Sequence, residues 1–202
     1  MLSFYLRYPH LIRLNRVLIP IKAHHRVIFK KTKTCQIKLA GRLTFGNNKL
    51  ALSSGSPSNI QLGYHSQFIC GKGVNIGPGV NIIQKENSIL EIGENTYFTA
   101  DSRLEVVNKI TIGSDCAISW GTSIIDDNHH TISYENKNKV NSDTVNIGNH
   151  VWIGCQTVIL PGTSIGNNCI IAAGSIVKGS FPENTLIAGN PAKVIKNDVS
   201  WK

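Results

Sequence analysis

The stretch from Ile147 to Val177, IGNHVWIGCQTVILPGTSIGNNCIIAAGSIV, decides the fold of this chain. An aliphatic residue stands at every sixth position of it, and these anchors are Ile147, Ile153, Ile159, Ile165, Ile171 and Val177. Neither a helix nor a strand has that period. A small residue follows most anchors, and a compact residue stands four places after each of the first five. A hexapeptide repeat of this form predicts a parallel β-solenoid, in which three hexads make one triangular turn and the anchors point inward.

The same period continues upstream in shorter runs, but its register is lost between Ile124 and Ile147, which are 23 residues apart. An insertion is therefore expected at residues 126–144, and loops that leave a rigid scaffold often carry binding or catalytic residues. The predicted organisation is a basic cap or leader at residues 1–36, a solenoid at residues 37–190 with this insertion, and a tail at residues 191–202.

The 202-residue chain has a net charge of +9, and its basic residues are concentrated in one half. No acidic residue precedes Glu86, so residues 1–85 carry 13 Lys and Arg and no Asp or Glu. Charges interrupt every apolar run near the start, which argues against a transmembrane span and a signal peptide. Residues 1–36 are expected to cap the open end of the solenoid, in one or two short helices, or to contact an anionic membrane surface. No recognition motif points to nucleic acid.

The five cysteines have no metal-ligand spacing, and two of them, Cys116 and Cys169, occupy compact positions of the repeat. They are expected to be packing residues with reduced thiols. The predicted location is therefore the cytoplasm, at the inner face of the membrane if the basic leader binds lipid.

The insertion opens with Asp126, Asp127, Asn128, His129 and His130. A histidine polarised by a carboxylate is a general base near neutral pH and can take a proton from an attacking hydroxyl. Alternate residues of an extended segment share a face, which would place Asp126, Asn128 and His130 together.

These stretches resemble a known family. The hexads, with ISWGTSIIDDNHHTI (118–132), the stretch quoted first and AGNPAKVIK (188–196), are similar to the hexapeptide-repeat acyltransferases, above all the maltose and galactoside O-acetyltransferases and the capsule or lipopolysaccharide O-acetyltransferases. The resemblance covers about residues 70–197. It implies an all-β fold, a left-handed parallel β-helix, a homotrimer with acetyl-CoA bound between neighbouring subunits, and no metal.

The resemblance also implies roles for single residues. The capsule-type pattern places the base at His130, with Asp126 and Asn128 beside it, whereas the galactoside-type pattern places the base at His129. Asp101 stands where sugar O-acetyltransferases often have an asparagine, and it is assigned to the acceptor together with Trp120 and Asn128. The coenzyme is expected to contact Trp152, Gly154, Cys155, Ala172, Ala173, Lys178, Lys193 and Lys196.

The predicted activity is direct transfer of the acetyl group of acetyl-CoA to a sugar hydroxyl of a surface-polysaccharide precursor, either a small molecule or lipid-linked. An amino sugar acceptor stays open. A carbonic-anhydrase-like zinc site would need three histidines, of which His150 could supply one. A non-catalytic solenoid is disfavoured by the histidine pair on the insertion.

Overall fold

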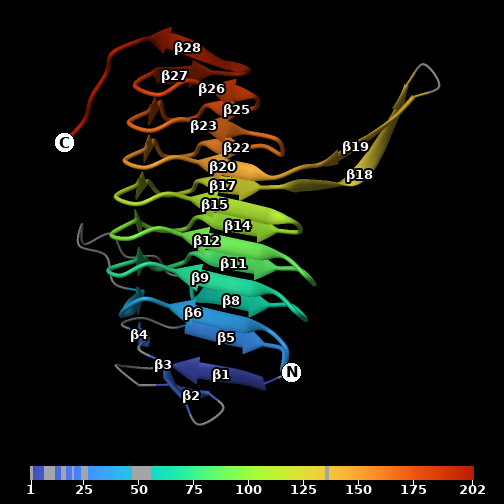
Figure 1. Cartoon of the computed structure of the whole chain (residues 1–202), viewed down its shortest axis with the longest axis vertical. Coiled ribbons are helices and arrows are strands. Elements are labelled where there is room, and N and C mark those ends of the chain that lie inside the picture. Colours follow the sequence, from blue (N-terminus) through green and yellow to red (C-terminus); the bar gives the residue numbers. More distant parts are fainter. Residues whose placement is uncertain are drawn as a thin grey trace.

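The computed structural model describes residues 2–6, 12–14, 17–19, 21–23, 27–46, 56–134 and 137–202. The described residues contain strands and no helix, and three sheets run the length of the molecule (Figure 1). Sheet I consists of β1 (Leu2–Leu6), β5 (Val27–Lys31), β8 (Ser58–Leu62), β11 (Asn81–Gln84), β14 (Arg103–Val106), β17 (Ser123–Ile125), β22 (Val158–Ile159) and β25 (Ile176–Val177).

Sheet II consists of β4 (Ile21–Ala23), β7 (Leu43–Phe45), β10 (Asn75–Ile76), β13 (Tyr97–Phe98), β16 (Ala117–Ile118), β21 (Trp152–Ile153), β24 (Ile170–Ile171), β27 (Leu186–Gly189) and β28 (Ala192–Lys196). Sheet III consists of β6 (Gln36–Leu39), β9 (Gln67–Cys70), β12 (Ile89–Ile92), β15 (Lys109–Ile112), β20 (Val145–Ile147), β23 (Ser164–Ile165) and β26 (Ser180–Phe181). Each coil adds one strand to sheet III, then sheet II, then sheet I, and so builds a triangular prism.

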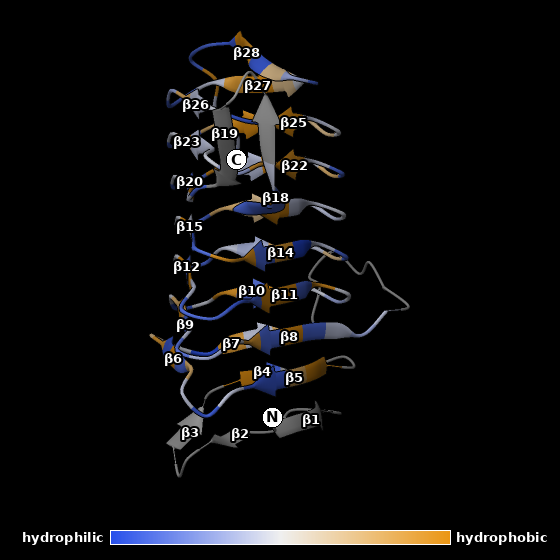
Figure 2. Ribbon diagram, turned by 90° about the vertical axis from the view of Figure 1, so that its right-hand side faces the viewer, coloured by the Kyte–Doolittle hydropathy of each residue, from blue (hydrophilic) through white to orange (hydrophobic). Residues whose placement is uncertain are grey.

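The aliphatic anchors form the core of the prism. Ile147 pairs with Ile165, and Ile153 pairs with Ile171, so each anchor lies directly over the anchor one coil away. All six predicted anchors are at most 3% exposed, which confirms the interpretation of the repeat. Figure 2 shows hydrophobic and hydrophilic residues alternating along the strands, as expected where one side of each strand faces the interior.

At each corner, one residue bends the chain and another allows the coils to stack closely. The left-handed bend does not lie at the small residue after each anchor but two places later, at His150, Gln156, Gly162, Asn168 and Gly174. The small residue instead allows close stacking, since a Cβ on Gly154 would lie 2.5 Å from the backbone nitrogen of Ala173 in the next coil. Glycine is therefore needed there for close approach of two backbones.

The compact residues before each anchor fill the inside of the corners. The hydroxyl groups of Thr157, Thr163 and Ser175 donate to carbonyl oxygens three residues earlier, at 2.8, 2.6 and 2.7 Å. These bonds satisfy polar groups that the corner would otherwise bury without a partner. Cys116 and Cys169 take the same position and are fully buried, which confirms that they are packing residues.

The insertion is an antiparallel hairpin of β18 (Asp127–Tyr134) and β19 (Lys137–Ser142), which projects away from the prism (Figure 1). It leaves the corner between sheets I and III and returns to the same corner. The N–H of Asp143 donates to the carbonyl of Asp126 at 2.9 Å and closes the root of the hairpin.

The prism begins earlier than residue 37, where the sequence analysis placed its start. β4 and β5 already pair in parallel with β7 and β8. β1 then pairs antiparallel with β5, and β2 (Ile12–Leu14) with β3 (Val17–Ile19), so the described part of the leader is strand and not helix. The basic residues Arg7, Arg16 and Arg26 lie outside the described residues, and lipid contact stays a prediction.

The tail also continues the prism. β28 pairs antiparallel with β27, so residues 192–196 form an edge strand of sheet II. Among the residues that the structure describes, no helix has the length and apolar character of a membrane span.

The close stacking at the corners predicts the effect of Gly77→Ala. The added Cβ would meet the backbone oxygens of Thr99 and Phe98 in the next coil, and backbone cannot move aside as a flexible side chain can. We expect the free energy of unfolding to fall by at least about 3 kcal/mol. Gly174→Ala is the control, because its Cβ would enter open space and only the positive φ of 69° opposes it, at roughly 1–2 kcal/mol. Equal losses in urea denaturation would contradict the stacking argument.

Candidate active site

The edge between sheets II and I gathers residues that lie far apart in the sequence. The N–H of Gly121 donates to Ala100 O at 3.2 Å, that of Gln156 to Trp120 O at 3.0 Å, and that of Gly174 to Cys155 O at 2.9 Å. Four coils therefore place the turns that contain Asp101, Trp120, Cys155 and Ala173 one above the next. The residues that the sequence analysis assigned to acceptor and coenzyme lie mostly along this one edge.

The edge offers amide groups to a ligand. The N–H of Gly154 is already used, since it donates to Ile171 O at 2.8 Å. The N–H of Cys155 has no backbone acceptor among the described residues. A corner amide of this kind suits an oxyanion that forms during acyl transfer.

The three lysines assigned to the coenzyme phosphates are exposed and lie on the last coils. Lys193 and Lys196 lie on β28, whereas Lys178 follows β25 at the corner between sheets I and III. The structure therefore separates Lys178 from the edge that carries Ala173.

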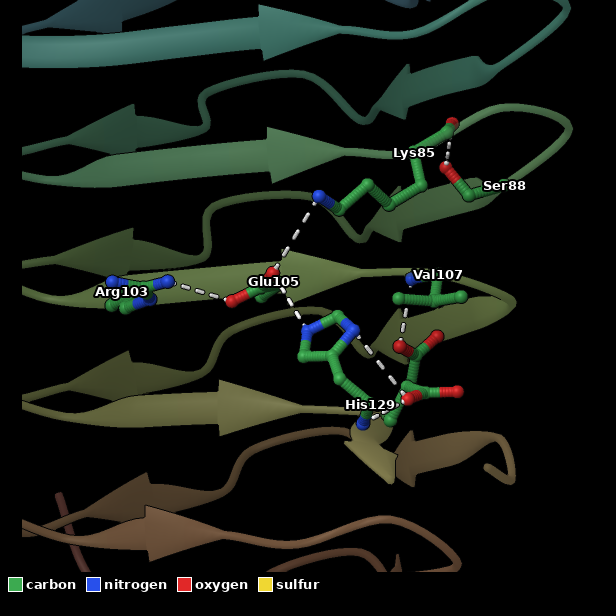
Figure 3. Close-up of polar contacts among 8 residues, drawn as sticks. Lys85, Ser88, Arg103, Glu105, Val107 and His129 are labelled. Carbon is green, nitrogen blue, oxygen red and sulfur yellow. Dashed lines mark hydrogen bonds and ion pairs between the residues drawn. The ribbon is translucent and has the colours of Figure 1, made fainter. Parts of the chain in front are cut away.

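A cluster of charged residues lies on the outer surface of sheet I, where the hairpin leaves the prism (Figure 3). Glu105 of β14 is its centre, with a side chain only 12% exposed. Its carboxylate lies 2.7 Å from Arg103 Nη2, 2.9 Å from His129 Nε2 and 4.0 Å from Lys85 Nζ. The other ring nitrogen of His129, Nδ1, lies 3.6 Å from Asp127 Oδ1.

The charges around Glu105 keep it ionised. Burial alone would raise the pKa of Glu105, but Arg103 and His129 outweigh burial and hold the pKa below its usual range. An ionised carboxylate favours donation from Nε2–H of His129, which leaves Nδ1 as the proton acceptor. The carboxylate of Asp127 then lies close enough to stabilise a proton that arrives on Nδ1.

Asp126 has a different role from the predicted one. Its side chain is fully buried, and its two oxygens accept the backbone N–H groups of Val107 at 2.7 Å and Asn108 at 2.8 Å. Burial raises the pKa of Asp126, and these amide donors oppose the rise. The carboxylate ties the root of the hairpin to the neighbouring coil, and Glu105 and Asp127 stand beside the imidazole in its place.

The predicted alternation of Asp126, Asn128 and His130 is wrong, because the segment is not a regular extended strand. His129 has a φ of 60°, and the pairing register of the hairpin shifts between Asp127 and Thr131. The carboxylate of Asp127 accepts the backbone N–H of His129, which is the local turn that this conformation requires. The turn directs His129 to Glu105 and leaves His130 exposed.

Glu105, Arg103 and Lys85 are not among the site residues predicted from the sequence. Glu105 alternates with buried Leu104 and Val106, so its outward direction could have been inferred from the strand pattern. The proximity of Glu105 to His129 could not be inferred, because the early coils vary in length and the sequence does not show which strands are neighbours.

A groove on sheet II lies beside the edge described above. Its volume is about 340 Å³, and its walls include Tyr97, Trp120, Trp152 and Trp201. His150 is not part of a histidine cluster: it stacks on Trp201 with ring centroids 4.3 Å apart, and its Nδ1 lies 3.2 Å from Asn168 Oδ1. Within the described ranges, no group of three or more His, Cys, Asp or Glu side chains is arranged to hold a metal ion.

Comparison with known proteins agrees with this architecture. Residues 144–179 match the family model described as bacterial transferase hexapeptide (six repeats). The chain is 32% identical over 136 residues to the putative lipopolysaccharide biosynthesis O-acetyl transferase WbbJ of Escherichia coli (strain K12), a match that covers 62% of this chain and 69% of that protein. It is 38% identical over 112 residues to the galactoside O-acetyltransferase of the same strain, with 54% of each chain covered.

Solved structures are similar over a longer range. The polysialic acid O-acetyltransferase OatWY superposes with a TM-score of 0.67 at 27% identity, covering 86% of both chains. A galactoside acetyltransferase in complex with coenzyme A superposes with a TM-score of 0.50 at 30% identity, covering 64% of both chains. The repeat, the three-sheet prism and these similarities together show that the chain is a left-handed parallel β-helix and belongs to the hexapeptide-repeat acetyltransferase family.

Proposed function

We propose that this protein transfers the acetyl group of acetyl-CoA to a hydroxyl of a sugar in a surface-polysaccharide precursor, with His129 as the general base. The observation that carries the proposal is the placement of the His129 imidazole between the carboxylates of Glu105 and Asp127 on an open surface. The geometry favours His129 over His130, because none of the contacts of the described residues gives His130 a carboxylate partner.

The reaction follows from these positions. His129 Nδ1 takes the proton of the acceptor hydroxyl while its oxygen attacks the thioester carbonyl carbon. The carbonyl becomes an oxyanion, which the N–H of Cys155 stabilises. The intermediate collapses with cleavage of the carbon–sulfur bond, and the proton held by His129 passes to the departing thiolate. The products are the acetyl ester and coenzyme A.

We propose that the coenzyme binds along the edge between sheets II and I, where side-chain size and charge suit it. The small side chains of Ala172 and Ala173 leave room for the pantetheine arm, and the N–H of Cys155 lies one coil away. Lys193 and Lys196 supply positive charge for the phosphates at the end of the prism. Lys178 fits this role less well in a single chain, because it lies at another corner.

The separation of base and edge supports a homotrimer with shared sites. His129 contacts the side of sheet I that meets sheet III, whereas Cys155 and Ala173 lie where sheet I meets sheet II. The strand β17 of three residues alone separates these corners by roughly 10 Å. A base from one chain and an edge from the next can converge more closely, and a closed ring of three prisms repeats that contact.

The acceptor class rests on the relatives. WbbJ is described as acting in lipopolysaccharide biosynthesis, and OatWY is described as acting on polysialic acid. A polysaccharide-related sugar is therefore the proposed acceptor here. The basic leader would hold the protein at the inner face of a membrane, near lipid-linked precursors.

The first prediction concerns the choice of base. His129→Ala should lower kcat by roughly 10²–10⁴-fold, with little change in the KM for acetyl-CoA, because the proton acceptor is lost. The measurement is release of free thiol from acetyl-CoA over a panel of sugars, nucleotide sugars and lipid-linked sugars. His130→Ala is the matched control and should retain most activity. The reverse order of the two effects would restore His130 as the base.

The second prediction concerns pH. The pKa of Glu105 is lower in the folded state than the value of about 4.3 of an unperturbed glutamate. The ionised form therefore stabilises the fold above that value, and the contribution is lost as the pH falls through the folded pKa. Urea denaturation should show Glu105→Gln to be less stable than the wild type at about pH 7, with the difference shrinking near about pH 3. A difference that does not change with pH would show that Glu105 acts only through packing.

The third prediction concerns the shared site. A chain with both His129→Ala and His130→Ala, mixed with a chain carrying Ala173→Trp, should regain activity that neither has alone, since one kind of interface pairs an intact base with an intact edge. Native mass spectrometry should confirm mixed trimers. A solution mass equal to one 22.1 kDa chain, or mixed trimers without regained activity, would contradict the shared site.

A further inference from the structure

The groove on sheet II exists because a small residue stands between two aromatic ones. Tyr97 pairs with Ala117, and Ala117 pairs with Trp152, so these three residues occupy the same position in successive coils. Tyr97 and Trp152 project outward and are about two-fifths exposed, whereas Ala117 is buried and forms the floor. Two coils span roughly 10 Å along the stack.

Trp201 and Lys202 form a further wall of the groove, and hydrogen bonds fix the segment that carries them. The N–H of Val199 donates to Asn184 O at 3.1 Å, and Nε1 of Trp201 donates to His150 O at 2.9 Å. One face of the Trp201 ring is covered by His150 at an interplanar angle of 6°. The ring lies 6.3 Å from that of Trp152, tilted by 48°. The aromatic wall is thus held in place before any ligand binds, which lowers the entropic cost of binding.

Polar groups are few in the groove. Thr99, which also lines it, has a buried hydroxyl without a hydrogen-bond partner among the described residues. Ser119 accepts the indole N–H of Trp152 at 3.4 Å, and Lys202 contributes an amine. No Asp or Glu side chain is among the residues that line the groove. A pocket with aromatic walls and a few polar groups is the usual form of a small-ligand site.

We propose that this groove binds the pyranose ring of the acceptor, and that Trp201 is a specificity-determining residue. The inference rests on the proposed acetyl transfer to a sugar. One face of a pyranose presents C–H groups, which the negative face of an aromatic ring attracts. A pyranose chair in contact at about 3.5–4.0 Å with an aromatic side chain on each side fits between residues two coils apart.

The position of the groove favours the acceptor over other ligands. Trp120 belongs both to the groove and to the edge between sheets II and I, and its carbonyl accepts the N–H of Gln156 next to Cys155. A sugar in the groove therefore lies beside the place proposed for the thioester. The base of a neighbouring chain would approach from the open side.

The experiment measures binding and kinetics separately. Saturation-transfer NMR without acetyl-CoA uses the wild type and three probes: methyl β-galactopyranoside, methyl β-glucuronide and the methyl glycoside of sialic acid. At least one probe should bind. Trp201→Ala, which removes a wall, and Ala117→Leu, which fills the floor, should each weaken that binding by about tenfold. Trp201→Phe keeps a ring over His150 and should retain part of the binding.

Controls identify the other possible occupants. Tyr64→Ala removes an exposed aromatic residue at the corner between sheets I and III and should not change binding. In the thiol-release assay, Trp201→Ala should raise the KM for the accepted sugar and leave the KM for acetyl-CoA and the oligomeric mass unchanged. A raised KM for acetyl-CoA would assign the groove to the coenzyme, and loss of oligomer would assign it to a neighbouring chain; either overturns the proposal.

Failure of this inference is distinguishable from failure of the proposed function. No binding of any probe by the wild type overturns the groove assignment, whether or not thiol is released. Binding that Trp201→Ala weakens, without thiol release on any sugar of the panel, supports the groove and contradicts the proposed transfer.

Discussion

The backbone hydrogen bonds between successive coils determine everything else in this molecule. The backbone of each coil exchanges hydrogen bonds with the coils on either side at equivalent positions, as in the bond from Gly148 N to Ile165 O. These bonds fix the spacing between the backbones of neighbouring coils. That spacing buries the anchors in columns and requires glycine where a Cβ would enter the next backbone, as at Gly154. It also decides which residues meet. Residues three hexads apart in sequence, such as Ile147 and Ile165, become neighbours in space.

The edge that carries the proposed coenzyme site brings together residues that are far apart in the sequence. Asp101 and Ala173 lie on turns three coils apart, yet a continuous series of corner hydrogen bonds joins them. The proposed base lies on the hairpin that interrupts the repeat after β17. The hairpin root is fixed by buried Asp126, and the imidazole is directed by Glu105 from the neighbouring coil. In the proposed mechanism the regular coils therefore position the coenzyme site, and the irregular hairpin contributes the base.

Much of this was predictable from sequence. The anchors, the compact corner residues and the place of the insertion follow from a period that holds without error from Ile147 to Val177. The left hand of the coil came from family resemblance, because periodicity has no handedness. The orienting residue of the base could not be predicted. Whether Asp126 or Glu105 contacts a histidine depends on a positive φ at His129 and on early coils of variable length, and neither leaves a pattern in the sequence.

The strands at the two ends of the stack have a consequence for association between copies. β1 and β28 pair antiparallel with their neighbours, whereas the coils between them pair in parallel. A second prism docked end to end would meet an edge whose hydrogen-bond pattern differs from that of its own coils. Exposed Lys193 and Lys196 add repulsion on β28. An antiparallel strand thus covers sheet I at one end of the stack and sheet II at the other, and at these two edges it opposes growth of the repeat into a fibre.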